Sequence, residues 1–408
     1  MLDNYHILIL DDSPVQCMHV AAMLKEVGFS RIVQAHTAGE GLERMRRQPD
    51  QIVVLDLDMP DTDGVQFIDR IASCGFTPML AISSSHSRRI VKSVSLMAKE
   101  RGFPVIGHFP KPFSLQHAHQ LRRQCLAFCE ANLDAAPQPP ALLAPLPAAP
   151  DALWNIDMLR QALRGDTIQG RFQPKMSLHT GRIVGAEVLA RYIPAHGQET
   201  LPEFFLPAVR QHGLEQELLF KMLHDGLQAH CTWRKLGYHV PVAVNLSVPL
   251  LQIADLPDRL HAVVIAAGVA PGSVTFELLE DDAVNAPSLY HMGASRMRLK
   301  GFGLAQDDFG RGHSTMYNLI STPFTELKID RAFVSGAWND EVRSAALMCA
   351  VTLGKELGLS VTAEGVETQE DMDLIKRIGC DYAQGFFIAA AVNTAQFFRV
   401  LEQPSTMV

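Results

Sequence analysis

Five short runs of hydrophobic residues alternate with longer amphipathic segments in the first 130 residues of the chain. The runs occupy residues 6–10, 31–35, 51–57, 78–83 and 104–109. Apolar runs of this length predict strands buried on both faces, and the amphipathic segments predict helices between them. Strands that alternate with helices are typical of an α/β fold, so we expect a doubly wound sheet of five parallel strands.

A second α/β pattern begins near residue 171 and contains eight strand-like segments. They occupy residues 171–178, 185–191, 240–247, 273–280, 302–309, 325–331, 360–366 and 382–388, mostly with helical stretches between them. Eight such strands in about 250 residues predict a TIM-type (β/α)8 barrel, in which functional residues follow the C-terminal ends of the strands.

Between the two patterns, residues 131–153 contain six prolines and many alanines. Proline-rich chain cannot hold a helix and favours an extended, semi-rigid conformation. We therefore expect a sheet domain at 1–130, a linker at 131–153 and a barrel domain at 154–408.

Composition removes several classes of function. Apolar residues make up 47% and charged residues 20% of the 408 residues, which argues against disorder. No apolar stretch is long enough to span a bilayer and the N-terminus lacks the features of a secretory signal, so we expect a cytoplasmic protein without membrane insertion. A net charge of −8 argues against a surface for nucleic acid, and we expect no binding to DNA. The seven cysteines form no CxxC pair and are interpreted as reduced thiols.

Polar residues close the strands of the predicted sheet, at the edge where ligands bind in this fold. They are Asp11, Asp12, Asp56, Ser83 and Lys111. Clustered carboxylates repel one another unless a cation joins them, and oxygen ligands suit Mg²⁺. The set fits a divalent cation beside an acceptor for a phosphoryl group, although each carboxylate alone is also typical of a helix cap or a turn.

Acidic residues dominate the strand ends of the predicted barrel. The polar residues there are Glu187, Asn245, Glu277, Glu280, Asp307, Asp308, Lys328, Asp330, Glu364, Glu367 and Gln384. So many carboxylates on one face require cations, and oxygen ligands favour Mg²⁺ or Mn²⁺ over zinc. We expect a two-metal site that Asp307 and Asp308 bridge. Two alternatives stay open: Asp330 could cap a helix, and Lys328 could be a structural counter-charge.

The first domain resembles the receiver domain of two-component response regulators. The motifs are DDSP (residues 11–14), DLDMPDTDG (residues 56–64), Ser83 and KPF (residues 111–113). The resemblance implies that Asp56 accepts phosphate from a sensor histidine kinase and that Asp11, Asp12 and Asp56 hold one Mg²⁺ with the carbonyl of Asp58. Ser83 and Lys111 would contact the phosphate.

The second domain resembles the EAL-domain phosphodiesterases of cyclic di-GMP, from about Phe172 to Phe398. The motifs are EVL (187–189), NLS (245–247), ELLE (277–280), DDFG (307–310), KID (328–330), AEGVE (363–367) and QG (384–385). The combination with a receiver is similar to RocR-type regulators. The resemblance implies hydrolysis of cyclic di-GMP to linear 5′-pGpG with two Mg²⁺ or Mn²⁺ ions, and a homo-oligomer formed through the EAL domain.

The same resemblance implies a role for each motif residue. The metal ligands would be Glu187, Asn245, Glu277, Asp307, Asp308 and Glu364, and the catalytic group would comprise Glu187, Lys328, Glu364 and Asp308, with Lys328 orienting or helping to activate the attacking water. Arg191 would hold a substrate phosphate, and Gln173 and Gln384 would lie in the nucleotide-binding region. Glu280 would anchor the loop after DDFG, with Glu367 and Asp330 in support.

Two departures from the family patterns bear on control. His108 replaces the aromatic switch residue of receivers, and the loop RGHSTMYNL (residues 311–319) differs from the usual one after DDFG. A catalytically weak or inactive effector that binds cyclic di-GMP or a partner protein is the alternative function. The presence of Asp308, Glu364 and Lys328 favours the enzyme.

Overall fold

The computed structural model describes residues 5–47, 52–60, 62–131, 154–194, 199–279, 287–310 and 316–402. Two compact units make up the chain. The first consists of Met1–Ala148 with Ala286–Leu299, and the second of Ala149–Asn285 with Lys300–Val408. Of the predicted linker, only Ala131 is among the described residues. The domain limits expected from the sequence remain a prediction.

A five-stranded sheet forms the centre of the first unit, as the hydrophobic runs predicted. Its strands are β1 (His6–Leu10), β2 (Arg31–Ala35), β3 (Ile52–Asp56), β4 (Met79–Ser84) and β5 (Val105–Pro110). All neighbouring strands are parallel and the order is β2-β1-β3-β4-β5. The doubly wound sheet is therefore confirmed.

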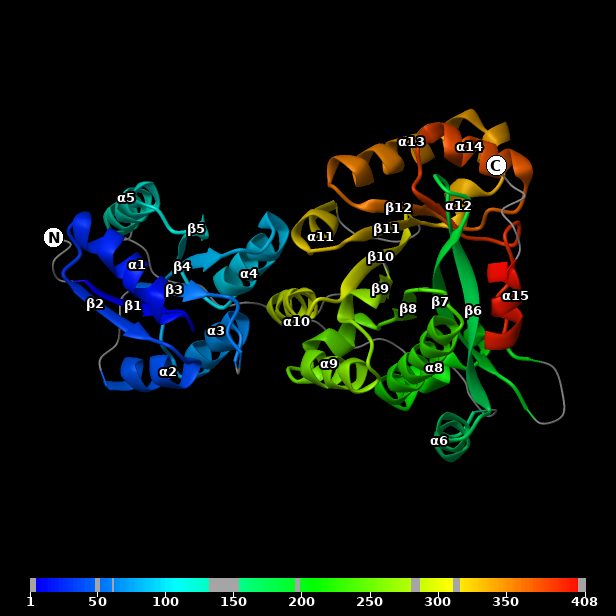
Figure 1. Cartoon of the computed structure of the whole chain (residues 1–408), viewed down its shortest axis with the longest axis horizontal. Coiled ribbons are helices and arrows are strands. Elements are labelled where there is room, and N and C mark those ends of the chain that lie inside the picture. The colour runs from blue at the N-terminus through cyan, green and yellow to red at the C-terminus, as the bar shows by residue number, and fades with distance from the viewer. Residues whose placement is uncertain are drawn as a thin grey trace. The chain divides into compact units, whose positions relative to one another are not determined.

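Helices cover both faces of this sheet (Figure 1). They are α1 (Pro14–Glu26), α2 (Ala38–Arg47), α3 (Gly64–Ser73), α4 (Arg88–Glu100) and α5 (Leu115–Ala131). One hydrophobic core joins the sheet to α1 and α5, and another joins it to α2, α3 and α4. Side-chain caps define two of the helix starts, because Ser13 accepts from the backbone N–H of Gln16, and Asp63 from that of Gln66.

The second unit is a closed barrel of eight strands, which confirms the expected architecture. The strands are β6 (Ile168–Ser177), β7 (Ile183–Tyr192), β8 (Val242–Asn245), β9 (Val274–Leu279), β10 (Gly303–Phe309), β11 (Glu326–Ile329), β12 (Ser360–Ala363) and β13 (Tyr382–Ala383). They close in the order β10-β11-β12-β13-β6-β7-β8-β9.

Two details differ from a regular parallel barrel. Strand β6 is antiparallel to both β7 and β13, because the five residues between β6 and β7 are too few for the crossover that parallel strands need. Strand β13 has two residues rather than the seven expected. It ends before Gly385, where an added Cβ would lie 2.2 Å from the carbonyl oxygen of Val366.

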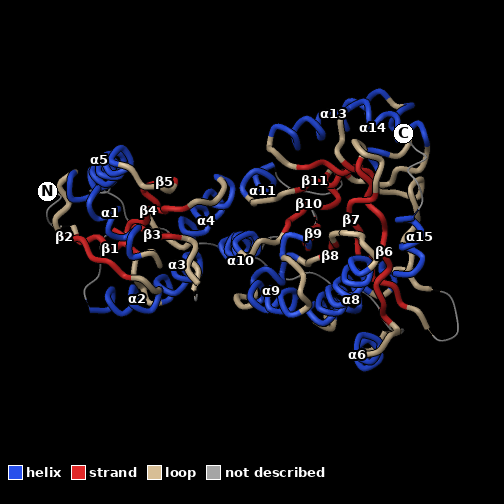
Figure 2. Tube along the Cα trace, viewed as in Figure 1, coloured by secondary structure: helices blue, strands red, loops and turns tan. Residues whose placement is uncertain are grey.

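The α-helices of the second unit lie outside the strands of the barrel (Figure 2). They are α6 (Ile156–Arg164), α7 (Leu206–Gln211), α8 (Glu215–Lys235), α9 (Leu256–Ala266), α11 (Met316–Ser321), α12 (Arg331–Val334), α13 (Glu341–Glu356), α14 (Gln369–Ile378) and α15 (Thr394–Glu402). Helix α10 (Pro287–Leu299) follows β9 in the sequence but belongs to the first unit. Within the described residues, no helix is both long and apolar enough to cross a membrane.

Candidate functional site

Five polar side chains gather at the carboxyl edge of the sheet, where the sequence placed them. Lys111 Nζ lies 2.8 Å from Asp11 Oδ2 and 2.7 Å from Asp56 Oδ2. Carboxylate oxygens of Asp11, Asp12 and Asp56 all lie within 4.8 Å of one another. Ser83 is paired with Asp56 across strands β3 and β4, and its buried hydroxyl has no hydrogen-bond partner among the described residues.

The electrostatics of this edge suit a cation and an anion together. Burial raises the pKa of Asp56, and the hydrogen bond from Lys111 opposes this effect. Burial alone would lower the pKa of Lys111, but its hydrogen bonds to Asp11 and Asp56 outweigh it and raise that pKa. Three carboxylates beside one ammonium leave an excess of negative charge that a divalent cation would neutralise. The Ser83 hydroxyl, which has no partner among the described residues, is available to a phosphoryl oxygen.

A buried lysine forms the centre of the polar cluster in the barrel. The Lys328 side chain is 1% exposed, and its Nζ lies within ion-pair distance of four carboxylates. The partners are Glu187 at 3.1 Å, Glu277 at 2.9 Å, Asp307 at 3.0 Å and Glu364 at 2.8 Å. Successive residues of a barrel strand point alternately into and out of the barrel. The inward-pointing positions of β7, β9, β10 and β11 bring Glu187, Glu277, Asp307 and Lys328 together.

Two amide side chains also orient Glu187. Gln384 Nε2 donates to Glu187 Oε2 at 2.6 Å and to Gln173 Oε1 at 3.2 Å, and Asn245 Nδ2 donates to Glu187 Oε1 at 3.2 Å. Burial would raise the pKa of Glu187, but the charge of Lys328 and these hydrogen bonds outweigh it and lower that pKa. These contacts therefore favour the ionised form of Glu187.

The other acids of the cluster are held toward their neutral forms when no cation is present. Burial and the charge of Glu187 raise the pKa of Glu277 well above its ordinary value, although Lys328 opposes the shift. Burial likewise raises the pKa of Glu364 well above its ordinary value, and it also raises the pKa of Asp307, against the effect of Lys328 in both cases. One ammonium is thus too little positive charge for this set of carboxylates.

Asp308 occupies an unusual backbone conformation. Its φ is +49°, and the register between β10 and β11 shifts between Gln306 and Phe309. Such an irregularity changes the direction of a side chain beside a site. Burial, then the charges of Asp307 and Asp330, raise the pKa of Asp308 to about 7.

The acids form two groups with the geometry of cation sites. Oxygens of Glu187, Glu277 and Asp307 lie within 4.8 Å of one another, and so do oxygens of Asp307, Asp308 and Glu364. Asp307 belongs to both groups. Oxygen-only donors around a deficit of positive charge could hold divalent metal ions, and the shared carboxylate suits a pair of them.

A cavity of about 320 Å³ opens over these acids. Nine of the side chains expected from the sequence line it: Gln173, Glu187, Arg191, Asp307, Asp308, Asp330, Glu364, Glu367 and Gln384. Glu187, Leu189 and Arg191 all face the cavity, as alternate residues of one strand should. Arg191 Nε lies 3.4 Å from Glu199 Oε1, and its Nη1 donates to the carbonyl oxygen of Ala190 at 2.8 Å.

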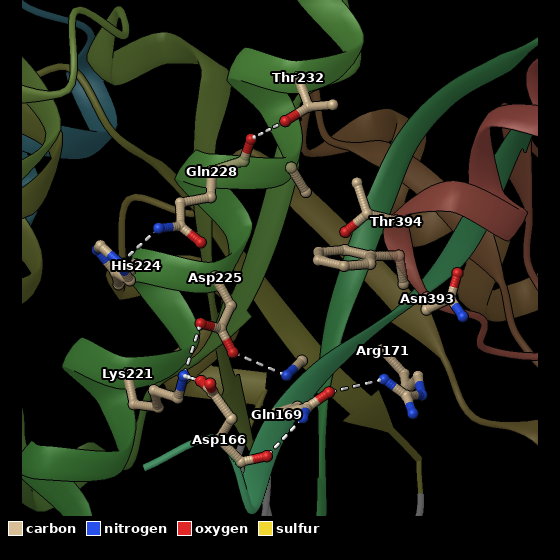
Figure 3. A pocket seen from close by; sticks show the side chains of 13 residues that line it. Asp166, Gln169, Arg171, Lys221, His224, Asp225, Gln228, Thr232, Asn393 and Thr394 are labelled. Carbon is tan, nitrogen blue, oxygen red and sulfur yellow. Dashed lines mark hydrogen bonds and ion pairs between the residues drawn. The ribbon is translucent and has the colours of Figure 1, made fainter. Parts of the chain in front are cut away.

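A cavity of about 510 Å³ elsewhere on the barrel has a different character (Figure 3). It lies between β6, α8 and the start of α15. Its Lys221 is already paired with Asp225 at 3.0 Å, and Asp225 also accepts from the backbone N–H of Gly170. It therefore offers none of the acid groupings found around Asp307.

Asp330 has both of the roles that the sequence allowed, while Glu280 and part of the loop after DDFG lie outside the described residues. Asp330 caps α12 by accepting from the backbone N–H of Ala332 at 2.8 Å, and it also lines the cavity, so both of its interpretations describe it. Glu280 and residues 311–315 of the loop after DDFG lie outside the described residues. Their anchoring and ordering roles stay predictions.

Sequence reasoning missed two residues beside the site. Phe386 is 68% exposed and lines the cavity. Asp371 is fully buried and accepts from the backbone N–H groups of Gly336, Glu367 and Thr368, which fixes the loop after Glu364. The spacing of Thr368 and Asp371 is that of a capping box, and this signal could have identified the anchor.

Comparisons with known proteins agree with this geometry. A model of the EAL domain matches residues 156–391, and a model of the response regulator receiver domain matches residues 7–120. The chain is 28% identical to "Cyclic di-GMP phosphodiesterase RocR" of Pseudomonas aeruginosa, over 97% of this chain and 98% of that protein.

Other relatives match only part of the chain. "Probable cyclic di-GMP phosphodiesterase PdeB" of Escherichia coli is 30% identical over 60% of this chain, which spans 46% of that protein. The solved structure "PaMucR Phosphodiesterase, c-di-GMP complex" is 29% identical with a TM-score of 0.56, and the match covers 59% of this chain and 98% of that one. The chain belongs to the EAL domain family and carries a response regulator receiver domain ahead of its EAL domain.

Proposed function

We propose that this protein is a response regulator whose EAL domain hydrolyses cyclic di-GMP to linear 5′-pGpG under the control of phosphorylation at Asp56. The observation that carries the proposal is the pair of acid groups that share Asp307 beside the buried Lys328. The likeness to a named cyclic di-GMP phosphodiesterase over nearly the whole of both chains supports the same activity.

The acids would divide between two divalent cations. Glu187, Asn245 and Glu277 would hold one ion, Asp308 and Glu364 would hold the other, and Asp307 belongs to both groups of acids. We infer Mg²⁺ or Mn²⁺ from the oxygen-only donors. Bound there, the cations supply Lewis acidity toward the phosphate and favour deprotonation of water.

The cavity lining suits a cyclic dinucleotide. Arg191 provides a guanidinium for a phosphate in a cavity whose lining also contains Arg331 and several carboxylates. The exposed Phe386 ring offers a face on which a guanine base stacks, and Gln173 with Gln384 offers amide groups for its polar edge.

Hydrolysis adds water to one phosphodiester. The water oxygen forms a bond to phosphorus, the bond from phosphorus to the 3′ oxygen breaks, and the leaving oxygen gains a proton. The phosphate remains on the 5′ oxygen, so the product is 5′-pGpG. Lys328 Nζ, fixed by its carboxylates, orients the attacking water.

Control begins at the receiver. One Mg²⁺ held by Asp11, Asp12 and Asp56 would neutralise the acids while a sensor histidine kinase transfers a phosphoryl group to Asp56. Ser83 and Lys111 would then contact the phosphoryl oxygens. We favour activation over inhibition, through the pairing of EAL domains or the order of the loop from Arg311 to Leu319. The oligomeric state is also part of this proposal.

The test is hydrolysis of cyclic di-GMP by the purified full chain. Wild type, Glu187→Ala and Asp56→Asn are each assayed with Mg²⁺ or Mn²⁺, with EDTA, and with and without a small acyl phosphate donor. We expect metal-dependent pGpG from wild type and Asp56→Asn, none from Glu187→Ala, and a response to the donor in wild type alone. Binding of cyclic di-GMP without cleavage by wild type would establish a binding effector instead, and an equal response in Asp56→Asn would show that Asp56 is not the control point.

A further inference from the structure

Helix α10 joins two strands of the barrel in the sequence but packs within the first unit. It lies against helices α3 and α4, and Met292 is part of the hydrophobic core that those helices share with the sheet. Leu289 and Leu299 pack against the same core. Positions 289, 292, 296 and 299 recur at helical spacing, so one face of α10 is directed at the receiver.

A buried ion pair fixes this face. Arg296 is 1% exposed, and its Nε donates to Asp63 Oδ2 at 2.8 Å. A second polar contact joins α4 to α10, where the buried Ser93 hydroxyl lies 3.3 Å from His291 Nδ1. Buried polar contacts depend strongly on geometry, because a misplaced partner leaves a desolvated charge unpaired. The contact therefore favours one arrangement of the helices.

The residue after Asp63 lies against the backbone of the phosphoacceptor. Asp63 is the N-cap of α3, and Gly64, the first residue of that helix, lies against the end of β3. A Cβ added to Gly64 would come within 2.4 Å of the backbone oxygen of Asp56 and 2.9 Å of Leu57 Cα. Any displacement of the chain at Asp56 therefore reaches the start of α3, and through Asp63 it reaches Arg296.

The other end of the connection is covalent. Helix α10 stands between β9, which carries Glu277, and β10, which carries Asp307 and Asp308. Only Lys300, Gly301 and Phe302 separate the end of α10 from β10. Three residues span at most about 10 Å, so the connection between the helix and β10 is short.

We propose that helix α10 is the element through which the receiver controls the EAL site: its contact with Asp63 and Ser93 senses the state of Asp56, and its connection to β10 places the metal-binding acids. The regulatory part of this inference rests on the proposed function. It accounts for the buried charge of Arg296 on α10, and it gives the signal a route other than the proline-rich segment.

Amide hydrogen exchange tests the sensing step without any hydrolysis. The full chain is measured with Mg²⁺, with and without beryllofluoride as a mimic of the aspartyl phosphate, in wild type and in Asp63→Asn. The substitution retains the Oδ1 that caps α3 and removes the charge that faces Arg296. Asp69→Asn is the matched control, because it removes the charge that Asp69 of α3 presents to Arg101 after α4, in an ion pair that does not include α10.

We expect beryllofluoride to change exchange in residues 287–299 of wild type and of Asp69→Asn, and to change it much less in Asp63→Asn. The ratio of hydrolysis rates with and without phosphodonor should fall about threefold or more in Asp63→Asn alone. Phosphate incorporation at Asp56 is measured in each variant. Ser93→Ala replaces Asp63→Asn if the latter is not phosphorylated.

The proposal is overturned if beryllofluoride leaves amide exchange in α10 of wild type unchanged. It is also overturned if phosphorylated Asp63→Asn or Ser93→Ala shows the wild-type ratio of hydrolysis rates with and without phosphodonor. If wild type does not hydrolyse cyclic di-GMP at all, the proposed function fails, and the exchange result still decides whether α10 senses the receiver.

Discussion

Replacement of Lys328 by methionine separates the structural and the catalytic roles of this side chain. The ammonium is 1% exposed and lies 2.8 to 3.1 Å from four carboxylates. Burial would lower its pKa, but the four acids outweigh burial and raise the pKa well above the ordinary value. Its contribution to stability is thus fully present up to about pH 10, the pKa of lysine in the unfolded chain.

Loss of one partner from a buried ionic cluster costs about 3 to 5 kcal/mol. For a domain of this size, that cost corresponds to a melting temperature lower by roughly 6 to 20 °C. The deficit should be larger at pH 8 than at pH 5. The reason is that Glu277 and Glu364 already have raised pKa values in the folded chain, and without the lysine their ionisation above about pH 4.3 costs more.

The assay is thermal unfolding of the full chain in EDTA, followed by tryptophan fluorescence. Trp154, Trp233 and Trp338 are the three tryptophans of the chain and all belong to the second unit, so the signal reports the barrel. Divalent cations should restore part of the lost stability, while hydrolysis stays reduced about a hundredfold or more if Lys328 also orients water. A melting temperature within 2 °C of wild type at pH 8 would refute the role as counter-charge, and normal hydrolysis by the folded variant would refute the role in catalysis.

The remaining predictions concern metal ligation by Glu187, base stacking on Phe386, the buried pair of Glu326 with Lys175, and proton release when metal binds. Glu187→Ala should lower turnover at least about a hundredfold and weaken Mn²⁺ binding measured by titration, and retention of both would exclude it as a ligand. Phe386→Ala should raise KM about tenfold with a smaller change in kcat, as loss of one stacked base predicts; an unchanged KM argues against stacking. Glu326→Gln, which breaks the buried pair with Lys175, should lower the free energy of unfolding by about 3 kcal/mol at pH 7. That pair lowers the pKa of Glu326 against the effect of burial, so the stability it contributes should be lost as pH falls below about 4.3. A difference in free energy of unfolding between wild type and Glu326→Gln that does not change with pH in urea would contradict this prediction. Because the pKa of Asp308 is about 7 in the metal-free protein, Mg²⁺ binding at pH 6 should release a proton and tighten toward pH 8, and calorimetry in buffers of different ionisation enthalpy measures both.

Strand periodicity predicted much of this molecule because parallel strands bring their carboxyl ends to one edge. Asp11, Asp56 and Ser83 end neighbouring strands of the sheet, and Glu277 and Asp307 end neighbouring strands of the barrel, so strand order alone brings each set together. The two open alternatives could not be decided from the pattern. Asp330 both caps a helix and lines the cavity. The four carboxylates around Lys328 come from three strands and from the residue that follows a fourth.

Other features depend on contacts that no local pattern records. The reversed direction of β6 follows from a short connection, which the sequence did contain between residues 177 and 183. The positive φ of Asp308 coincides with a register shift between β10 and β11. Helix periodicity cannot reveal that Arg296 pairs with Asp63, 233 residues away. The pair of Arg296 and Asp63 was missed because its partners are distant in the chain.

Hydrolysis in ¹⁸O-labelled water tests most directly whether the EAL site cleaves cyclic di-GMP. Wild-type protein with Mg²⁺ or Mn²⁺ is incubated with the cyclic dinucleotide, and the products are identified by mass spectrometry. We predict 5′-pGpG with a single ¹⁸O in its terminal phosphate, since water attacks phosphorus and the bond to the 3′ oxygen breaks. Unlabelled pGpG would contradict direct attack by water, and cyclic di-GMP that stays intact while bound to the metal-loaded protein would contradict the enzymatic function itself.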